Sequence, residues 1–327
     1  MVAVGFAVLC LCWSTTWQAI RYCLDGYPPM SGAGLRFLLA TALIFLLLRL
    51  RRGELHLPGG RHQHLAIAAA GVVNGLGYGC IYVAERTLSG GTTAIICAAS
   101  PLFTLVLARL MGLEVLSARR LIGMLFGMGG VVALFLDGLT VGSGQFVAML
   151  LAGLAAAFFW PIYSALLKRH AQQVPPLVAT TYFLLYTALT LCVMSLGLRE
   201  PLPAFRSAPW TAHAALLYLS IIGSVVAWSI YLWLLQRLDL TVLATLGLIQ
   251  PVLALLLDLV TDNAQLKLSG YLGTLLVLLG MGLAAWPMRR PPNALSAPAA
   301  PSSPAATGAP SEPLPPAPSG PVPSGAP

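Results

Sequence analysis

Polar and aromatic side chains recur at helical spacing inside long apolar stretches of the sequence. In the first stretch, Ser14, Gln18 and Arg21 stand at positions i, i+4 and i+7, which places them on one face of a helix. Trp13 and Trp17 flank that face. Because a polar side chain in contact with lipid is costly, such a face normally points toward other helices or water. These groups could therefore hydrogen-bond a small polar molecule.

Three later stretches carry comparable faces: Asn74, Tyr78 and Tyr82; Trp160 and Ser164, with Tyr163 beside them; and Ser224, Trp228 and Tyr231. Ser100 and Gln250 each precede a proline inside an apolar stretch. Such a proline removes a backbone hydrogen bond and exposes a carbonyl, so it could be a bending point or a static kink. Taken singly, each residue is explained as well by interhelical packing or by a place at the membrane interface. Taken together, the faces predict an aromatic, uncharged cavity suited to a zwitterion or an amphipathic metabolite. The predicted substrate-binding residues are Ser14, Trp17, Gln18, Asn74, Tyr78, Tyr82, Ser100, Trp160, Ser164, Trp228, Tyr231 and Gln250.

Two charges lie far inside apolar stretches. Arg36 and Asp258 could pair between helices, or Asp258 could be a proton-coupling carboxylate. Alternatively, Arg36 could extend to the membrane interface, as long cationic side chains do, and Asp258 could contact Lys267. Glu85 stands at the end of an apolar stretch and is expected to be solvated.

The elements that position these residues must be membrane-spanning helices. Hydrophobic residues make up 58% of the 327 residues and charged residues only 9%, too few to cover a soluble body of this size. Uninterrupted apolar stretches long enough for a helix to cross a bilayer exclude strands, which would alternate with period two. The ten predicted helices cover about 2–21, 32–48, 65–84, 92–112, 119–137, 144–167, 177–197, 212–235, 240–260 and 268–287.

The distribution of positive charge predicts the orientation. With the N-terminus in the cytoplasm, eleven arginines and lysines fall in inner connections and five in outer ones, which fits the excess of positive charge on the cytoplasmic side. An even number of spans then puts both termini inside. Residues 291–327 hold 13 of the 25 prolines and no aromatic residue, a composition that cannot bury enough apolar area to fold. We expect a flexible cytoplasmic tail there.

Several classes of function are disfavoured by the sequence. The net charge of +8 is spread over short connections and forms no patch for nucleic acid. The six cysteines form no CxxC pair, so disulfides are not expected. The histidines of the first basic loop are expected to be solvated and to hold no metal. No GxxxxGK[ST] nucleotide-binding loop is present, and no cofactor is expected. An enzyme would need paired acids, or histidine and acid, at cavity depth, and the sequence offers only isolated acids.

The chain contains an internal repeat offset by about 150 residues. Thr93-Ala94-Ile95 leading to Pro101, Gly123 and Gly130 recurs as Leu243-Ala244-Thr245 leading to Pro251, Gly273 and Gly280. Trp13 with Arg21 eight residues later recurs as Trp160 with Lys168. Each half then holds five helices, and an odd number inverts the second half relative to the first. Inverted repeats are the architecture of many secondary transporters, whose substrate lies near the midplane between the halves.

With these motifs in order, residues 1–288 resemble the EamA-type branch of the drug/metabolite transporter superfamily. The stretches that carry the resemblance are Trp13-Ser14-Thr15-Thr16-Trp17, Tyr27-Pro28-Pro29 through Gly34-Leu35-Arg36-Phe37, Ala98-Ala99-Ser100-Pro101-Leu102-Phe103-Thr104 through Gly112-Leu113-Glu114, and Leu121-Ile122-Gly123 with Gly130. The resemblance implies ten helices, two inverted five-helix units, a central cavity lined by helices 1, 3, 4, 6, 8 and 9, and transport of amino acids or related metabolites, commonly outward. The second half departs from the pattern, with Asn263-Ala264 where the first half has Glu114.

We therefore predict an all-α polytopic membrane protein with ten transmembrane helices arranged as two inverted five-helix repeats. Residues 1–138 form the first repeat, 142–288 the second, and 291–327 the tail. The expected function is secondary transport of small metabolites by alternating access, as an exporter in a bacterial-type inner membrane, with membrane lipids and a small-molecule substrate as its partners. The alternatives are a lipid flippase or an exporter of hydrophobic drugs or pigments, and, less favoured, an intramembrane enzyme.

Overall fold

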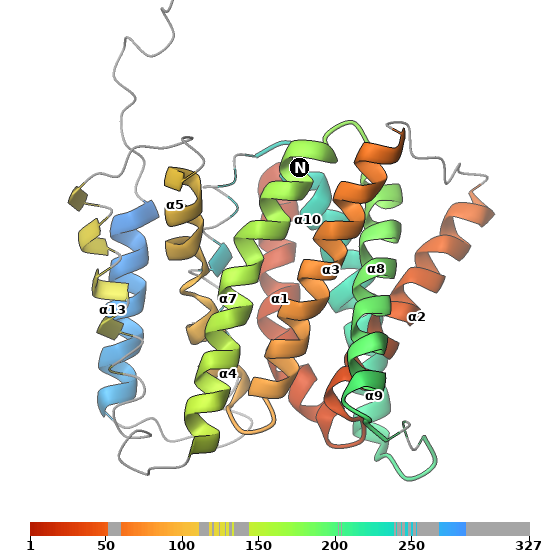
Figure 1. The fold of residues 1–327 in the computed structure, drawn as a ribbon, viewed down its shortest axis with the longest axis horizontal. Coiled ribbons are helices and arrows are strands. Elements are labelled where there is room, and N and C mark those ends of the chain that lie inside the picture. The colour runs from red at the N-terminus through yellow and green to blue at the C-terminus, as the bar shows by residue number, and fades with distance from the viewer. Residues whose placement is uncertain are drawn as a thin grey trace, which may run out of the picture. The chain divides into compact units, whose positions relative to one another are not determined.

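The computed structural model describes residues 1–51, 60–110, 144–201, 205–238 and 268–285, together with separate positions in 118–133, 240–253 and at 203. Helices make up the described ranges, and no strand occurs in them (Figure 1). Six stretches are long and apolar enough to cross a membrane. The shortest of the six has 22 residues, which at about 1.5 Å rise per residue exceeds the roughly 30 Å of a hydrocarbon core.

The helices follow the apolar stretches of the sequence closely. The prediction of an all-helical membrane protein is confirmed. The predicted helices 119–137 and 240–260, and the tail 291–327, lie largely or wholly outside the described residues, so the count of ten stays a prediction. The elements are α1 (Val2–Leu24), α2 (Pro29–Leu50), α3 (Gly60–Ala84), α4 (Gly90–Cys97), α5 (Ser100–Leu110), α7 (Gly144–His170), α8 (Pro176–Gly197), α9 (Trp210–Ser220), η1 (Ile221–Val226), α10 (Ala227–Leu235) and α13 (Leu268–Ala285).

Two predicted helices depart from regular α-helical winding. The stretch 92–112 is divided by a turn at Ala98-Ala99, and Pro101 stands at the second position of α5. Proline is well placed there, because the amide it lacks would have no partner in the first turn of a helix. Pro101 thus begins a helix instead of kinking one. The stretch 212–235 is continuous but contains the π-helical segment η1 between α9 and α10, a widened turn that 3.6-residue periodicity does not anticipate.

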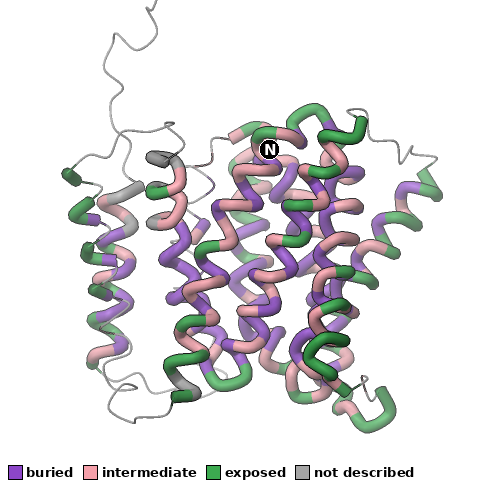
Figure 2. The backbone as a smooth tube through the Cα atoms, viewed as in Figure 1, coloured by how far each residue is buried: buried purple, intermediate pink, exposed green. Residues whose placement is uncertain are grey.

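The most extensive helix contacts join the two halves of the sequence. α3 packs along α7 and α8, α2 packs on α8, and α1 lies against α9 and α10 (Figure 1). Buried residues run along the facing sides of these helices, whereas the outward sides are largely exposed (Figure 2). An apolar exterior of this kind suits lipid, which does not penalise exposed leucine or valine.

Close approach of α3 to α8 depends on two glycines one turn apart. A Cβ atom at Gly71 would lie 2.6 Å from the Tyr186 Cβ and 2.7 Å from the Phe183 carbonyl oxygen, and one at Gly75 would lie 2.7 Å from the Thr190 Cβ. Between them, the Thr187 hydroxyl donates to the Gly71 carbonyl (3.1 Å) and accepts from the Asn74 Nδ2 (3.0 Å). Small residues and interhelical hydrogen bonds are the forces that hold helices together in lipid.

Glycines of the internal repeat also lie at close helix contacts. Gly280 on α13 packs on the backbone at Gly123 and Gly127, and Gly130 packs on the backbone at Gly273 and Val277.

A carboxylate fixes the start of α2. The Glu200 side chain accepts from the backbone amides of Met30 (3.1 Å) and Ser31 (2.8 Å). A negative charge is favourable at a helix N-terminus.

We expect Gly71→Ala to destabilise the protein, because the added methyl group must push α8 away from α3. The cost should be about 1–3 kcal/mol, as for other overpacked sites, and should appear as a lower midpoint of thermal unfolding in detergent. Gly282→Ala on α13 is the matched control, since nothing lies within 4 Å of its Cβ position. An unchanged midpoint for Gly71→Ala would contradict the close contact.

Candidate functional site

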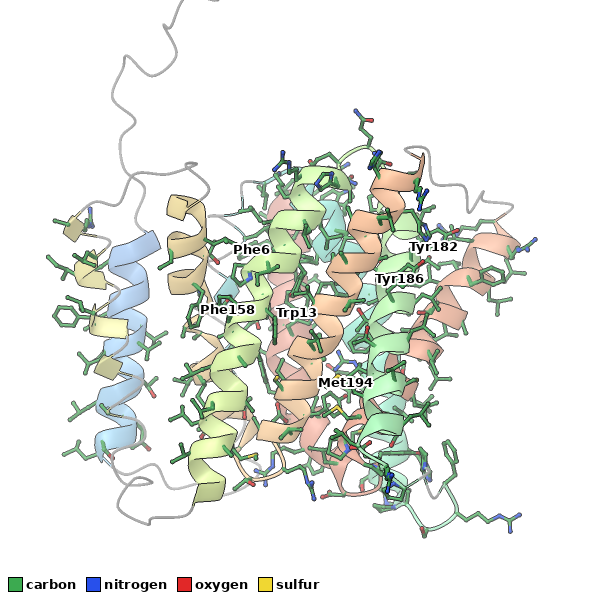
Figure 3. All side chains as sticks on the ribbon, in the orientation of Figure 1. Phe6, Trp13, Phe158, Tyr182, Tyr186 and Met194 are labelled. Atoms are coloured by element: carbon green, nitrogen blue, oxygen red, sulfur yellow. The ribbon has the colours of Figure 1, made fainter. Side chains whose placement is uncertain are left out.

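An aromatic cluster occupies the contact between the two halves of the sequence. Trp13, which is labelled in Figure 3, contacts three of its rings, with ring centroids 5.5 Å from Trp160, 5.2 Å from Trp228 and 5.2 Å from Tyr231. Edge-on and tilted contacts at these distances are the favourable geometries for aromatic rings. The cluster forms because α1 packs against α10, and α3 against α7.

Beside this cluster lies a pocket with about 450 Å³ of empty space, which we call the main pocket. Its walls are mostly aromatic and aliphatic, and come from α1, α3, α7 and the residue Gln250. The lining residues are Trp13, Thr16, Trp17, Ile20, Asn74, Gly77, Tyr78, Ile81, Ala156, Trp160, Tyr163 and Gln250.

A second pocket, the adjoining pocket, has about 410 Å³ of empty space. It shares Trp17, Trp160 and Gln250 with the main pocket. The break between α4 and α5 forms one of its walls, through Ala98, Ser100 and Pro101. The interrupted helix therefore contributes directly to a cavity, which is the usual place for irregular backbone within a membrane.

Six of the twelve predicted substrate-binding residues line a pocket. Asn74 and Tyr78 line the main pocket, Ser100 lines the adjoining pocket, and the three shared residues line both. The Asn74 side chain is at the same time a donor to Thr187, so part of it serves helix packing. Pocket lining by itself does not establish substrate binding, and the set stays a prediction.

The other six predicted residues are buried around the pockets without lining them. The Ser14 hydroxyl donates to the Cys10 carbonyl of its own helix (2.7 Å), and the Ser164 hydroxyl is hydrogen-bonded to the Tyr231 phenol (2.8 Å). Trp228 belongs to the aromatic cluster. The positions that line neither pocket are Ser14, Gln18, Tyr82, Ser164, Trp228 and Tyr231.

The prediction omitted Trp13, Thr16 and Tyr163, which line the main pocket. Trp13 and Tyr163 stand next to predicted residues in the sequence, so each was treated as the flank of a polar face. The internal repeat carried a usable signal, because it aligned Trp13 with Trp160, and these two rings are in contact.

In the described residues that line the main pocket, the buried polar atoms without a hydrogen-bond partner are donors. The Trp13 Nε1, the Trp17 Nε1 and the Gln250 Nε2 are buried and have no hydrogen-bond partner among the described residues. By contrast, several buried hydroxyls are occupied by carbonyls one turn earlier in their own helices, as at Ser14 and Ser164. A ligand with acceptor atoms could pair with these nitrogens.

Two charged residues differ from their expected surroundings. Arg36 is fully buried and does not extend to an interface, because its guanidinium donates to the Ser224 Oγ and the Gly223 carbonyl. Glu85 is also buried, at 3% exposure, and is not the solvated residue that the sequence predicted. Asp258, the suggested partner of Arg36, and Lys267, the suggested alternative contact of Asp258, lie outside the described residues.

His64 likewise departs from the solvated loop that was expected. It lies in the first turns of α3, where its Nε2 is hydrogen-bonded to the Tyr186 phenol of α8. The described positions contain no group of three or more histidine, cysteine or acidic side chains placed to hold a metal ion. Together, the main pocket, the adjoining pocket and the side chains around them have the geometry of a binding site between helices.

The EamA-like transporter family model matches the chain twice, over residues 1–136 and 147–286. The chain belongs to the EamA-like transporter family. It is therefore an integral membrane protein of the drug/metabolite transporter superfamily, and the resemblance noted in its motifs is confirmed. The main pocket of this EamA-like transporter lies between the two matched segments, since α1 and α3 belong to the first, and α7 and Gln250 to the second.

Individual relatives agree with this assignment. The chain is 28% identical to the uncharacterized inner membrane transporter YedA of Escherichia coli strain K12, over 76% of this chain and 79% of that protein. It is 24% identical to a probable amino-acid metabolite efflux pump of the same strain, over 85% of this chain and 92% of the relative. A solved crystal structure at 24% identity shares the fold, with a TM-score of 0.61 over 86% of this chain and 96% of that one.

We expect Trp13→Ala to destabilise the EamA-like transporter strongly, because it removes the ring that contacts three others. Large aromatic residues deleted from a packed core cost about 3–5 kcal/mol, which should appear as a lower unfolding midpoint in a denaturing-detergent titration. Trp210→Ala is the matched control, as Trp210 is 77% exposed at the start of α9. Equal stability of the two variants would contradict the contribution of these three ring contacts to stability.

Proposed function

We propose that this EamA-like transporter exports amino acids or related small metabolites by alternating access between two inverted halves. One observation carries the proposal: the main pocket is bounded by residues of both family segments. A pocket between halves can open to either side of the membrane as the halves rock against each other. The name of one relative, a probable amino-acid metabolite efflux pump, supports the substrate class and the direction.

The chemistry of the pocket supports a small amphipathic substrate. Indole and phenol rings provide apolar surface, while unpaired N–H groups of Trp13, Trp17 and Gln250 provide polar contacts. Such a combination of an apolar wall and few polar groups is typical of small-molecule sites. Energy would come from a gradient of the substrate or of protons, and the membrane would be a bacterial inner membrane with both termini in the cytoplasm.

Transport by purified protein in proteoliposomes tests the proposal. We expect uptake of at least one labelled amino acid from a panel of neutral and acidic ones, above the uptake of empty liposomes. Trp17→Ala and Tyr78→Ala should each lower that uptake by roughly tenfold or more, because they remove anchoring surface at the centre of the pocket.

Two exposed aromatic residues provide the controls. Trp210→Ala and Tyr271→Ala remove side chains that are 77% and 48% exposed, and both variants should transport like the unmodified protein. A comparison of metabolites released by cells with and without the transporter checks the direction. Failure of every amino acid, together with protein-dependent movement of a labelled lipid in the same liposomes, would replace this proposal with the flippase alternative.

A further inference from the structure

Arg36 on α2 carries a charge into the centre of the helix bundle. Its guanidinium donates to the Ser224 Oγ (2.9 Å), the Gly223 carbonyl (3.1 Å) and the Tyr82 hydroxyl (3.5 Å). All three acceptors are neutral. An arginine side chain keeps its proton in proteins, so this position holds a fixed positive charge.

The π-helical segment η1 accommodates the guanidinium. A π turn leaves carbonyls outside the regular hydrogen-bond pattern, and such turns are frequent at functional sites. At Gly223 the carbonyl accepts from Arg36, and a Cβ atom would lie 3.1 Å from the Arg36 Nη2 and 2.7 Å from the Thr16 Cγ2. Glycine at this position therefore permits the guanidinium to approach the backbone of η1.

The charge lies directly behind the wall of the main pocket. The Arg36 Cζ is 5.0 Å from the centroid of the Tyr78 ring, and Tyr78 lines the pocket. Thr16, whose Cγ2 lies close to the backbone of η1 at Gly223, lines the pocket as well. One layer of side chains thus separates the guanidinium from the space that a ligand would occupy. Charge interactions are weakly screened in such a water-poor interior.

Burying a charge is costly unless a charge of opposite sign compensates it. Within the described ranges, no carboxylate is in ion-pair contact with the Arg36 guanidinium; its contacts are hydroxyls, a carbonyl and the rings of Phe37 and Tyr78. An anionic group in the main pocket would supply compensation, and an amine there would add repulsion.

The unpaired donors of the main pocket also favour an anionic group over an amine. Trp13, Trp17 and Gln250 are 3%, 6% and 3% exposed, and each presents a buried N–H group with no partner in the described chain. All three line the main pocket. A carboxylate only accepts hydrogen bonds and an ammonium only donates them, so these nitrogens complement the first group and not the second.

We propose that Arg36 is a specificity-determining residue, and that together with the donors of Trp13, Trp17 and Gln250 it makes the main pocket select substrates that carry a carboxylate. Arg36 acts through the pocket wall and touches no substrate. The proposal rests on the transport function proposed above and narrows it, because amines and cationic compounds of the same size are rejected.

A matched series of leucine derivatives tests the selection. Unlabelled L-leucine should compete strongly with the uptake of labelled L-leucine into proteoliposomes. So should 4-methylpentanoate, which lacks the amino group. L-leucinamide and isoamylamine, which lack the carboxylate, should need at least tenfold higher concentrations, equivalent to about 1.4 kcal/mol. The four compounds share one hydrocarbon chain, so differences report on the polar groups.

Variants of Arg36 separate its charge from its place in the fold. Arg36→Gln should reduce the acid-over-amine preference to within about threefold, while Arg36→Lys should keep most of it, since long-range attraction needs only the charge. Arg237→Gln, on an exposed arginine after α10, is the matched control. If Arg36→Gln does not fold, Trp17→Phe and Gln250→Leu provide the test, because each removes an N–H donor and should weaken competition by 4-methylpentanoate more than competition by isoamylamine.

The outcomes distinguish the two proposals. Uptake of labelled leucine with equal competition by isoamylamine and 4-methylpentanoate would overturn selection by the carboxylate and leave transport standing. An unchanged acid preference in Arg36→Gln, or in both donor variants, would overturn the roles of those residues. Absence of protein-dependent uptake of leucine and of 4-methylpentanoate, each supplied in labelled form, would overturn both the transport function for this class and the selection built on it.

Discussion

The close packing of α3 against α7 and α8 is the constraint on which the rest of the molecule depends. Helices already in lipid gain little hydrophobic energy by associating, so their contact relies on short-range packing and interhelical hydrogen bonds. Gly71 and Gly75 let the backbones approach, and Thr187 bonds to both Gly71 and Asn74 across the contact. Since α3 also carries Tyr78 and α7 carries Trp160, the same contact sets the walls of the main pocket.

The polarity of the pocket follows from how the helices use their hydroxyl groups. Serine and threonine side chains bond to carbonyls of the preceding turn, as Ser14 does to Cys10 and Thr181 to Leu177. Indole nitrogens cannot do this, because they stand too far from their own backbone. The hydroxyls are thus largely occupied inside the helices, whereas the nitrogens of Trp13 and Trp17 have no partner among the described residues. The pocket was predicted to be aromatic and uncharged, and its unpaired buried polar groups are hydrogen-bond donors.

Long-range patterns in the sequence predicted the fold better than local ones predicted the site. Apolar stretches and the internal repeat indicated the helices and the family, because both depend on many residues at once. Single polar residues were less informative. Ser224, Trp228 and Tyr231 were placed on one face by 3.6-residue spacing, yet Ser224 bonds to Arg36 while Trp228 and Tyr231 join the aromatic cluster.

The burial of Arg36 and Glu85 was missed for a related reason. The position of a residue along an apolar stretch indicates its depth in the membrane. Whether its side chain is solvated depends instead on the helices that pack around it. The guanidinium of Arg36 is held by η1, almost two hundred positions later in the chain. A contact of this kind requires the tertiary structure, and no spacing rule within one helix reveals it.

The widened turn of η1 also bears on how related carriers can diverge. A π turn holds one residue more than the α-helical turn that it replaces, so removing one position from η1 would restore regular winding and leave the side chains of α10 facing the same way. Trp228 and Tyr231 would stay in the aromatic cluster, whereas the Gly223 carbonyl that accepts from Arg36 would become available to the regular helical hydrogen-bond pattern. A single-codon deletion could therefore change how the buried charge is held in one evolutionary step, without altering the aromatic surroundings of the pocket.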